Sequence, residues 1–241
     1  MTGIVRIAQK NEHVEIVFDD GRLNIMSPTM LGELHLAFDR AEREKQVVVV
    51  KGREGIFSAG FDLKVFREQG PEAICDMLRL GAELAFRILT FPLPVLSACT
   101  GHAYPMGAFL LLASDIRVGA RGPFRIGLNE VTIGITIPNF GIELARQRLT
   151  PASFQRAAVT GQMLSPDEAV AAGFLDQAVD PAALDATVEQ NAVALAKIDF
   201  AAHAATKKRA RFGAIAAVRE AIDTEIQLDT YRRRFEEQGR P

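Results

Sequence analysis

Two glycine-containing turns in this 241-residue sequence have residue types and spacing that could form a catalytic site. Residues 57–64 read Phe-Ser-Ala-Gly-Phe-Asp-Leu-Lys, and residues 100–107 read Thr-Gly-His-Ala-Tyr-Pro-Met-Gly. Each follows a strand-like run, and a strand-to-helix turn leaves backbone N–H groups unpaired where the helix begins. Two such turns side by side could direct two N–H groups at one developing oxyanion. The same residues also fit two tight turns that bind nothing, and local pattern alone favours that simpler interpretation.

Other common catalytic motifs are absent from the sequence. It holds no G-x-x-x-x-G-K-[ST], no H-E-x-x-H and no G-x-S-x-G. The four histidines are dispersed, so we expect no metal site, and nothing indicates a Ser or Cys nucleophile. Cys75 and Cys99 lie far apart and are typical of reduced core residues in a cytoplasmic protein.

Composition and charge narrow the class of protein further. A hydrophobic fraction of 48% and a charged fraction of 24% are typical of a globular chain and exclude a disordered one. The longest apolar run considered, residues 108–113, is far shorter than the roughly 20 residues of a membrane helix. The first residues do not have the pattern of a secretory leader, so we expect neither secretion nor membrane insertion.

The charge is unevenly distributed along the chain. The net charge of −2 argues against a nucleic-acid partner. Residues 197–241 contain ten Lys and Arg and seven Asp and Glu, a net charge of +3, which leaves a net charge of −5 for residues 1–196. This basic tail predicts either a solvated helix face or a site for an anionic ligand.

The elements that must position the two turns follow from hydrophobic periodicity. Alternating or wholly apolar runs predict strands, and apolar residues at helical spacing predict helices. The order of elements predicts an α/β fold with crossover connections, and no G-x-G-x-x-G motif indicates a dinucleotide site. The predicted strands are residues 4–8, 14–18, 47–50, 95–99, 115–119 and 174–179, and the predicted helices are 28–45, 74–90, 107–113, 142–149, 152–160, 166–172 and most of the chain after 181, with a loop at 51–60.

The two turns, in this order, resemble those of the enoyl-CoA hydratase/isomerase family, the crotonase superfamily. F-S-A-G-F-D-L-K is similar to its first oxyanion turn, and P-V-L-S-A-C-T-G-H-A-Y-P-M-G-A-F-L-L-L-A-S-D-I-R-V-G to its second turn, buried helix and next strand. Residues 124–135 and 161–179 continue the resemblance, which covers about residues 4–215. It implies a spiral of repeated β-β-α units at 1–197, and a helical region at 198–241 that assembles homotrimers or hexamers.

The resemblance also implies an acyl-CoA thioester substrate and an enolate intermediate. The oxyanion would be held by the backbone N–H groups of Phe61 and Met106, and Glu130 would be the catalytic base. No cofactor is expected, because coenzyme A is part of the substrate. The residues implied to contact the substrate are Ala59, Asp62, Lys64, Gly107, Phe109, Lys207 and Lys208, with Lys64, Lys207, Lys208 and Arg209 as candidates for the CoA phosphates.

The residue at position 109 bears on the reaction. Hydratases of this family use a second glutamate at this position, and here it is Phe109, with no carboxylate between residues 100 and 114. One base suffices to move a double bond, so the sequence favours delta-3 to delta-2 enoyl-CoA isomerization. The alternatives are a hydratase in which His102 replaces the missing acid, and a non-catalytic acyl-CoA-binding protein, which Phe109 and Met106 would also fit.

Overall fold

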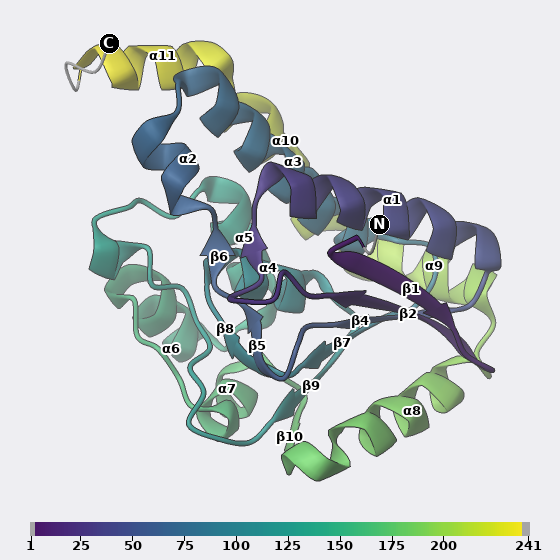
Figure 1. The fold of residues 1–241 in the computed structure, drawn as a ribbon. Coiled ribbons are helices and arrows are strands. Elements are labelled where there is room, and N and C mark those ends of the chain that lie inside the picture. Colours follow the sequence, from purple (N-terminus) through teal and green to yellow (C-terminus); the bar gives the residue numbers. More distant parts are fainter. Residues whose placement is uncertain (1–2, 238–241) are drawn as a thin grey trace.

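One six-stranded sheet organises the protein, whose computed structural model describes residues 3–237. Its strand order is β1-β2-β4-β7-β9-β10 (Figure 1). β1 and β2 are antiparallel and all other neighbours are parallel, which fits the predicted crossover connections. The strands are β1 (Val5–Gln9), β2 (His13–Phe18), β4 (Val47–Lys51), β7 (Val95–Cys99), β9 (Ile116–Ala120) and β10 (Gln177–Val179).

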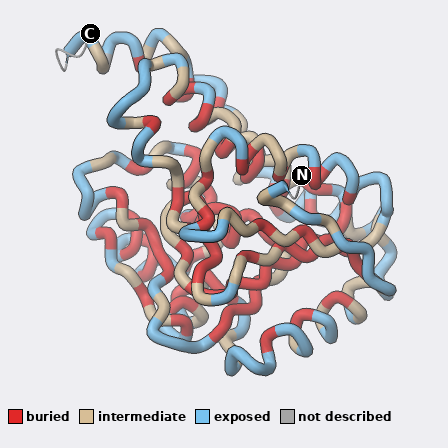
Figure 2. Tube along the Cα trace, in the orientation of Figure 1, coloured by how far each residue is buried: buried red, intermediate tan, exposed pale blue. Residues whose placement is uncertain are grey.

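The valine run of β4 is covered on both faces of the sheet. Val47 and Val49 pack into a cluster with α8 (Leu184–Leu195), whereas Val48 and Val50 belong to the larger core under α1 (Pro28–Glu44) and α3 (Pro71–Thr90). Successive side chains of a strand point to opposite faces, so a run of four apolar residues suits a strand with helices on both sides. Figure 2 shows the resulting buried centre of the sheet between exposed helix surfaces.

Two short parallel ladders lie beside the main sheet and carry the predicted turns. β3 (Ile25–Met26) pairs with β6 (Gly60–Phe61), and β5 (Gly55–Ser58) pairs with β8 (Gly101–Ala103). The expectation of a loop throughout 51–60 was therefore wrong. Its glycines indicated irregular chain, but pairing with β8, through an irregular register, makes residues 55–58 a strand.

The remaining helices agree with most of the sequence predictions. The apolar helix predicted at 107–113 begins two residues earlier, at Pro105. The predicted strand 174–179 is limited to β10. The predicted helix 152–160 is α6 followed by a π-helical turn at Gln155–Val159. The helices not yet named are α2 (Leu63–Glu68), α4 (Pro105–Ala113), α5 (Asn139–Arg148), α6 (Pro151–Phe154), α7 (Pro166–Ala172), α9 (Phe200–Ala210), α10 (Phe212–Glu225) and α11 (Leu228–Glu237).

The last helices pack back onto the main body. α10 contacts α5 and α3, and α11 contacts α3. Val218, Ile222 and Ile226 join the larger core. The predicted boundary between residues 197 and 198 falls in the connection between α8 and α9. Residues 1–2 of the predicted core and residues 238–241 of the predicted helical region lie outside the described residues. None of the helices within 3–237 combines the length and hydropathy that a membrane crossing requires.

Candidate active site

The two predicted turns lie against each other. An ideal Cβ built on Gly60 would be 3.6 Å from Pro105 Cδ and 3.8 Å from the backbone nitrogen of Met106. The backbone N–H of Tyr104 donates to the Ser58 carbonyl at 2.9 Å, which ties the start of α4 to the first turn. The structure therefore brings the first turn to the N-terminal end of α4, as the motifs predict.

Ser58 fixes the shape of the first turn. Its hydroxyl donates to the Asn24 carbonyl at 2.7 Å and accepts the Gly60 N–H at 3.1 Å. Gly60 has a φ of +93°, a conformation that side-chain-bearing residues rarely adopt. The next residue, Phe61, is thereby turned toward α4, while the Ala59 N–H donates to Leu23.

The second turn supplies free donors because of how α4 begins. Pro105 is its first residue and has no N–H, and the N-cap Tyr104 gives no side-chain hydrogen bond. The helical ladder starts with Ala108, whose N–H donates to the Tyr104 carbonyl at 2.9 Å. The N–H groups of Met106 and Gly107 thus have no acceptor within the helix. Positive polarity at this end of the helix favours a developing negative charge there.

Glu130 reaches the same region through a third segment of chain. Ile126 and Ala103 form a parallel bridge. The Ala103 N–H donates to the Arg125 carbonyl at 3.0 Å, and the Gly127 N–H donates to the Ala103 carbonyl at 3.1 Å. Because the two segments run in the same direction, one continues from the bridge to Met106 and the other continues to Glu130. Glu130, the predicted base, and Met106, the predicted second donor, therefore follow the same end of one paired segment.

The carboxyl group of Glu130 is buried without a partner. Only 5% of the residue is exposed, and neither side-chain oxygen has a hydrogen bond. Burial raises its pKa from the ordinary value of 4.5 to about 7. Of the carboxylates in the described part of the chain, it alone has buried oxygens without hydrogen bonds. Its burial does not extend to the next apolar residues along the chain, because Val131 and Ile133 are exposed.

Phe109, at the position where the resemblance implies a second carboxylate in hydratases, is surrounded by apolar packing. The residue is fully buried, and its ring meets Phe140 of α5 edge to face. An ideal Cβ on Gly141 would be 2.5 Å from Phe109 Cε1, so a glycine on α5 makes room for the ring. The side chain is thus enclosed between α4 and α5.

The predicted phosphate ligands are placed differently from one another. Lys64 and Lys208 are exposed, and the side chain of Asp62 caps α2 by accepting the Lys64 N–H at 2.9 Å. Lys207, by contrast, is only 6% exposed, and its ammonium donates to Asp115 at 2.7 Å and to the Phe91 carbonyl at 3.0 Å. Burial lowers its pKa to about 8. The expectation of an accessible cation at Lys207 is corrected: it serves a buried ion pair.

His102, the fallback acid of the hydratase alternative, is used as a hydrogen-bond acceptor. Its Nδ1 accepts the backbone N–H of Arg125 at 3.0 Å and lies 3.3 Å from the Tyr104 hydroxyl. Burial, and secondarily the charge of Arg125, lower its pKa. In the neutral ring the proton is therefore on Nε2. Nδ1 holds together the two segments that lead to Met106 and Glu130.

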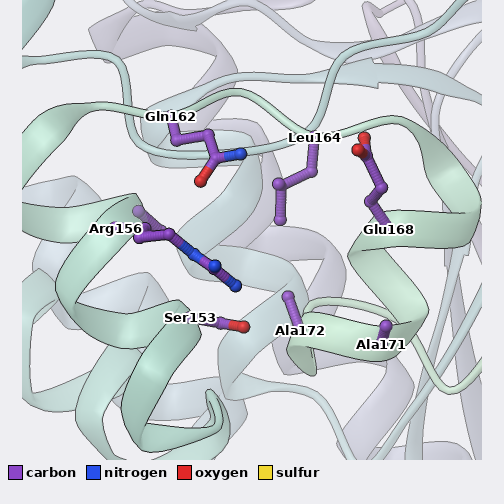
Figure 3. A pocket seen from close by; sticks show the side chains of 8 residues that line it. Ser153, Arg156, Gln162, Leu164, Glu168, Ala171 and Ala172 are labelled. Atoms are coloured by element: carbon purple, nitrogen blue, oxygen red, sulfur yellow. The ribbon is translucent and has the colours of Figure 1, made fainter.

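A cavity of about 240 Å³ lies apart from these residues (Figure 3). The cavity lies between α7 on one side and α6 with the π-helical turn on the other, and none of the predicted site residues lines it. Arg156 and Gln162 point into it from one side, and Glu168 lies on the other. Within residues 3–237, no cluster of three or more His, Cys, Asp or Glu residues is arranged as metal ligands.

Gly81 is the site residue that sequence reasoning missed. It lies inside α3, where its missing Cβ accommodates the ring of Phe61 and the thioether of Met106. The available signal was a glycine inside an otherwise regular amphipathic helix, which is unfavourable without a packing reason.

Comparison with known proteins agrees with the resemblance. The family described as Enoyl-CoA hydratase/isomerase matches residues 9–238. Human mitochondrial enoyl-CoA delta isomerase 1 is 30% identical over 166 residues, covering 67% of this chain and 55% of the human protein. The match thus spans little more than half the length of that relative.

Solved structures give fuller coverage. An Mtb enoyl-CoA isomerase is 41% identical with a TM-score of 0.88, covering 92% of this chain and 97% of that one. An enoyl-CoA hydratase from Mycobacterium marinum is 41% identical with a TM-score of 0.87 and the same coverage. These similarities confirm the predicted crotonase-like α/β fold.

Proposed function

The chain belongs to the enoyl-CoA hydratase/isomerase family, and on that premise we propose that it is a delta-3 to delta-2 enoyl-CoA isomerase. One observation carries the proposal: Glu130 is a buried carboxyl group whose oxygens are free of hydrogen bonds. A carboxylate with these properties can take up and return a proton without first breaking other contacts.

The proposed reaction uses the three groups in sequence. Glu130 removes a proton from C2, beside the thioester carbonyl, and the electron pair of that C–H bond moves into an enolate. The N–H groups of Phe61 and Met106 stabilise the charge on the enolate oxygen. The double bond then shifts from C3–C4 to C2–C3 as Glu130 returns the proton to C4. Atoms and charge balance with no metal and no further cofactor, because coenzyme A is part of the substrate.

Hydration of a 2-enoyl-CoA is the second candidate, because relatives with each name have similar identity to this chain. Phe109 argues against it. Addition of water needs a group that activates the water and another that delivers a proton, and an enclosed aromatic ring can do neither. A dry pocket favours return of the proton to the substrate.

Coenzyme A would bind where the first turn and the basic C-terminal region are exposed. We assign Ala59, Asp62, Lys64 and Lys208 to this site, with Gly107 facing the thioester and Phe109 enclosing the acyl end. Charge reversal at Lys208 should weaken binding of acyl-CoA in calorimetry. An unchanged affinity would make the positive charge of this residue a solvated surface feature only.

Assembly into homotrimers, or hexamers of them, is part of the same proposal. Large apolar side chains lie exposed at Val131 and Ile133, directly after the base, and at Phe212 on α10. Burial of such residues between copies would stabilise an oligomer. A cytoplasmic setting is supported by the two free, buried cysteines. Sedimentation velocity would establish the oligomeric state.

The decisive experiment is a parallel assay with 3-enoyl-CoA and 2-enoyl-CoA substrates. The wild type should isomerise the first much faster than it hydrates crotonyl-CoA. Glu130→Gln should lower isomerization about 10²–10⁴-fold while acyl-CoA still binds. Glu44→Gln, on an exposed part of α1, is the matched control and should retain full activity. Hydration as fast as isomerization, or full activity of Glu130→Gln, would overturn the proposal.

A further inference from the structure

Gly81 of α3 contacts the side chains of both residues whose N–H groups form the proposed oxyanion hole. An ideal Cβ at this position would be 2.5 Å from both Cε1 and Cζ of Phe61 and 3.2 Å from Sδ of Met106. No Cβ tolerates a contact of 2.5 Å, so an alanine here requires the ring to move. One missing methyl group therefore sets the space available to both side chains.

The surroundings of Phe61 limit how the ring could yield. Its ring packs edge to face with Phe66 of α2, with 6.4 Å between centroids, and Met106 lies beside it. Its backbone pairs with Met26 in the short β3–β6 ladder, one residue after Gly60 with its positive φ. Phe61 is partly exposed, so its ring can yield on its open side, and that movement takes the ring away from α3 and Met106.

A glycine at this place otherwise costs stability. Position 81 is in the interior of the 20-residue helix α3, where alanine would be the better helix former. Gly32 of α1 offers the opposite situation, because a Cβ built there has nothing within 4 Å. The two helical glycines therefore form a matched pair, one enclosed by site residues and one facing open space.

We propose that Gly81 is a positioning residue of the oxyanion hole, which seats Phe61 and Met106 against α3 so that their N–H groups point at the thioester oxygen. This inference rests on the proposed function in taking those N–H groups as the oxyanion donors. Gly81 itself touches no reacting atom. Its effect should appear in stabilisation of the enolate rather than in affinity for coenzyme A.

The first test compares Gly81→Ala with Gly32→Ala in the isomerase assay. Gly81→Ala should lower kcat at least tenfold, with the hexanoyl-CoA dissociation constant changed less than threefold. Its pH profile should keep the wild-type midpoint, because Glu130 is untouched. Gly32→Ala should retain wild-type kcat. A Gly81→Ala enzyme that behaves like Gly32→Ala would refute the inference.

Rescue separates positioning from a general packing defect. Phe61→Leu removes the ring atoms Cε1 and Cζ but keeps the backbone N–H, so Gly81→Ala with Phe61→Leu should recover most of the kcat lost in Gly81→Ala. If Gly81→Ala alone does not fold, the double variant is compared with Phe61→Leu alone. Equal stability and kcat of these two support the inference, whereas a double variant that remains unfolded or inactive contradicts it.

A measurement without turnover distinguishes this inference from the proposed function. The ¹³C resonance of bound [1-¹³C]hexanoyl-CoA should shift downfield on the wild type, because hydrogen bonds polarise the thioester carbonyl. The shift should be lost in Gly81→Ala and recovered in the double variant. A wild type that gives this pattern without isomerase activity refutes the proposed reaction alone, and a shift retained in Gly81→Ala refutes the role of Gly81.

Discussion

Phe109 and Phe140 meet edge to face between α4 and α5, with ring centroids 5.2 Å apart and ring planes at 67°. Such pairs contribute about 0.5–1.5 kcal/mol beyond the area they bury. The ring of Phe109 is also enclosed by the backbone side of α5 at Gly141. The position that would distinguish a two-carboxylate site is therefore part of the helix packing.

We expect Phe109→Glu to destabilise the protein rather than create a hydratase. It removes a packed ring, which costs about 3–5 kcal/mol, and places a carboxyl group in an apolar enclosure. Phe109→Leu, which keeps the site apolar, should lose less stability. Urea denaturation of both variants checks this, and a Phe109→Glu protein of wild-type stability that hydrates crotonyl-CoA would contradict it.

The raised pKa of Glu130 predicts the pH dependence of turnover. The base must be ionised to accept a proton, and its pKa is about 7. Below that value kcat/KM for a 3-enoyl-CoA should fall about tenfold per pH unit, and above it kcat/KM should level off. Rates measured between pH 5 and 9 test this. A profile without a midpoint in the neutral range would remove Glu130 as the titrating base.

The same shift predicts that Glu130 reduces stability at neutral and higher pH. The folded pKa of about 7 exceeds the ordinary 4.5, so the folded state binds more protons than the unfolded state between these values, and stability falls as pH rises through them. The full loss, about 3 kcal/mol, is present above pH 7. Glu130→Gln should therefore be more stable than the wild type at pH 8, with a smaller difference at pH 5. Chemical denaturation at both values checks the sign, and equal stabilities at pH 8 would contradict the prediction.

Sequence patterning was sufficient for elements with a strong period. The Val47–Lys51 strand and α7 at Pro166–Ala172 needed only local information, because an uninterrupted valine run and a Ser165 cap followed by Pro166 have few alternatives. β5 could not be predicted in this way. Its four residues become a strand only by pairing with β8, some 45 residues later in the chain.

The candidate site likewise has residues that local motifs predict and residues whose roles depend on contacts distant in the sequence. Glu130 and the two turns were identified from their motifs, whereas their placement depends on pairing between distant segments, β5 with β8 and Ala103 with Ile126. The burial of Lys207 was not predictable, because its partner Asp115 lies 92 residues away. The role of Gly81 likewise depends on which rings lie opposite α3, and periodicity within one helix contains no such information.

Asp115 is expected to be a major determinant of stability. Its carboxylate accepts from Lys207 and Arg211, each at 2.7 Å, and from the Val95 N–H at 2.8 Å. Asp115→Asn would leave two cations in a buried position without a counter-charge, which costs about 3–5 kcal/mol.

Asp167→Asn is the control for that variant. Asp167 pairs with Arg121 at 3.0 Å on the surface, where both side chains are at least half exposed. Such pairs contribute about 1 kcal/mol or less. Urea denaturation should separate the two variants clearly, and similar losses would show that the Asp115 cluster is no stronger than a surface pair.

His102 should be replaceable by asparagine but not by phenylalanine. Asparagine offers a side-chain oxygen that can accept the Arg125 N–H, as Nδ1 does in the wild type at 3.0 Å. Phenylalanine keeps the edge-to-face packing on Phe124 but cannot accept the Arg125 N–H. We expect His102→Phe to lose about 1 kcal/mol of stability. Its kcat should also fall, because the segment that leads to Glu130 is held less firmly. If His102 instead delivered a proton, both variants would lose turnover equally. Isomerase and hydratase rates of the two variants distinguish these mechanisms, because retained activity in His102→Asn requires an acceptor at this position and excludes a proton donor.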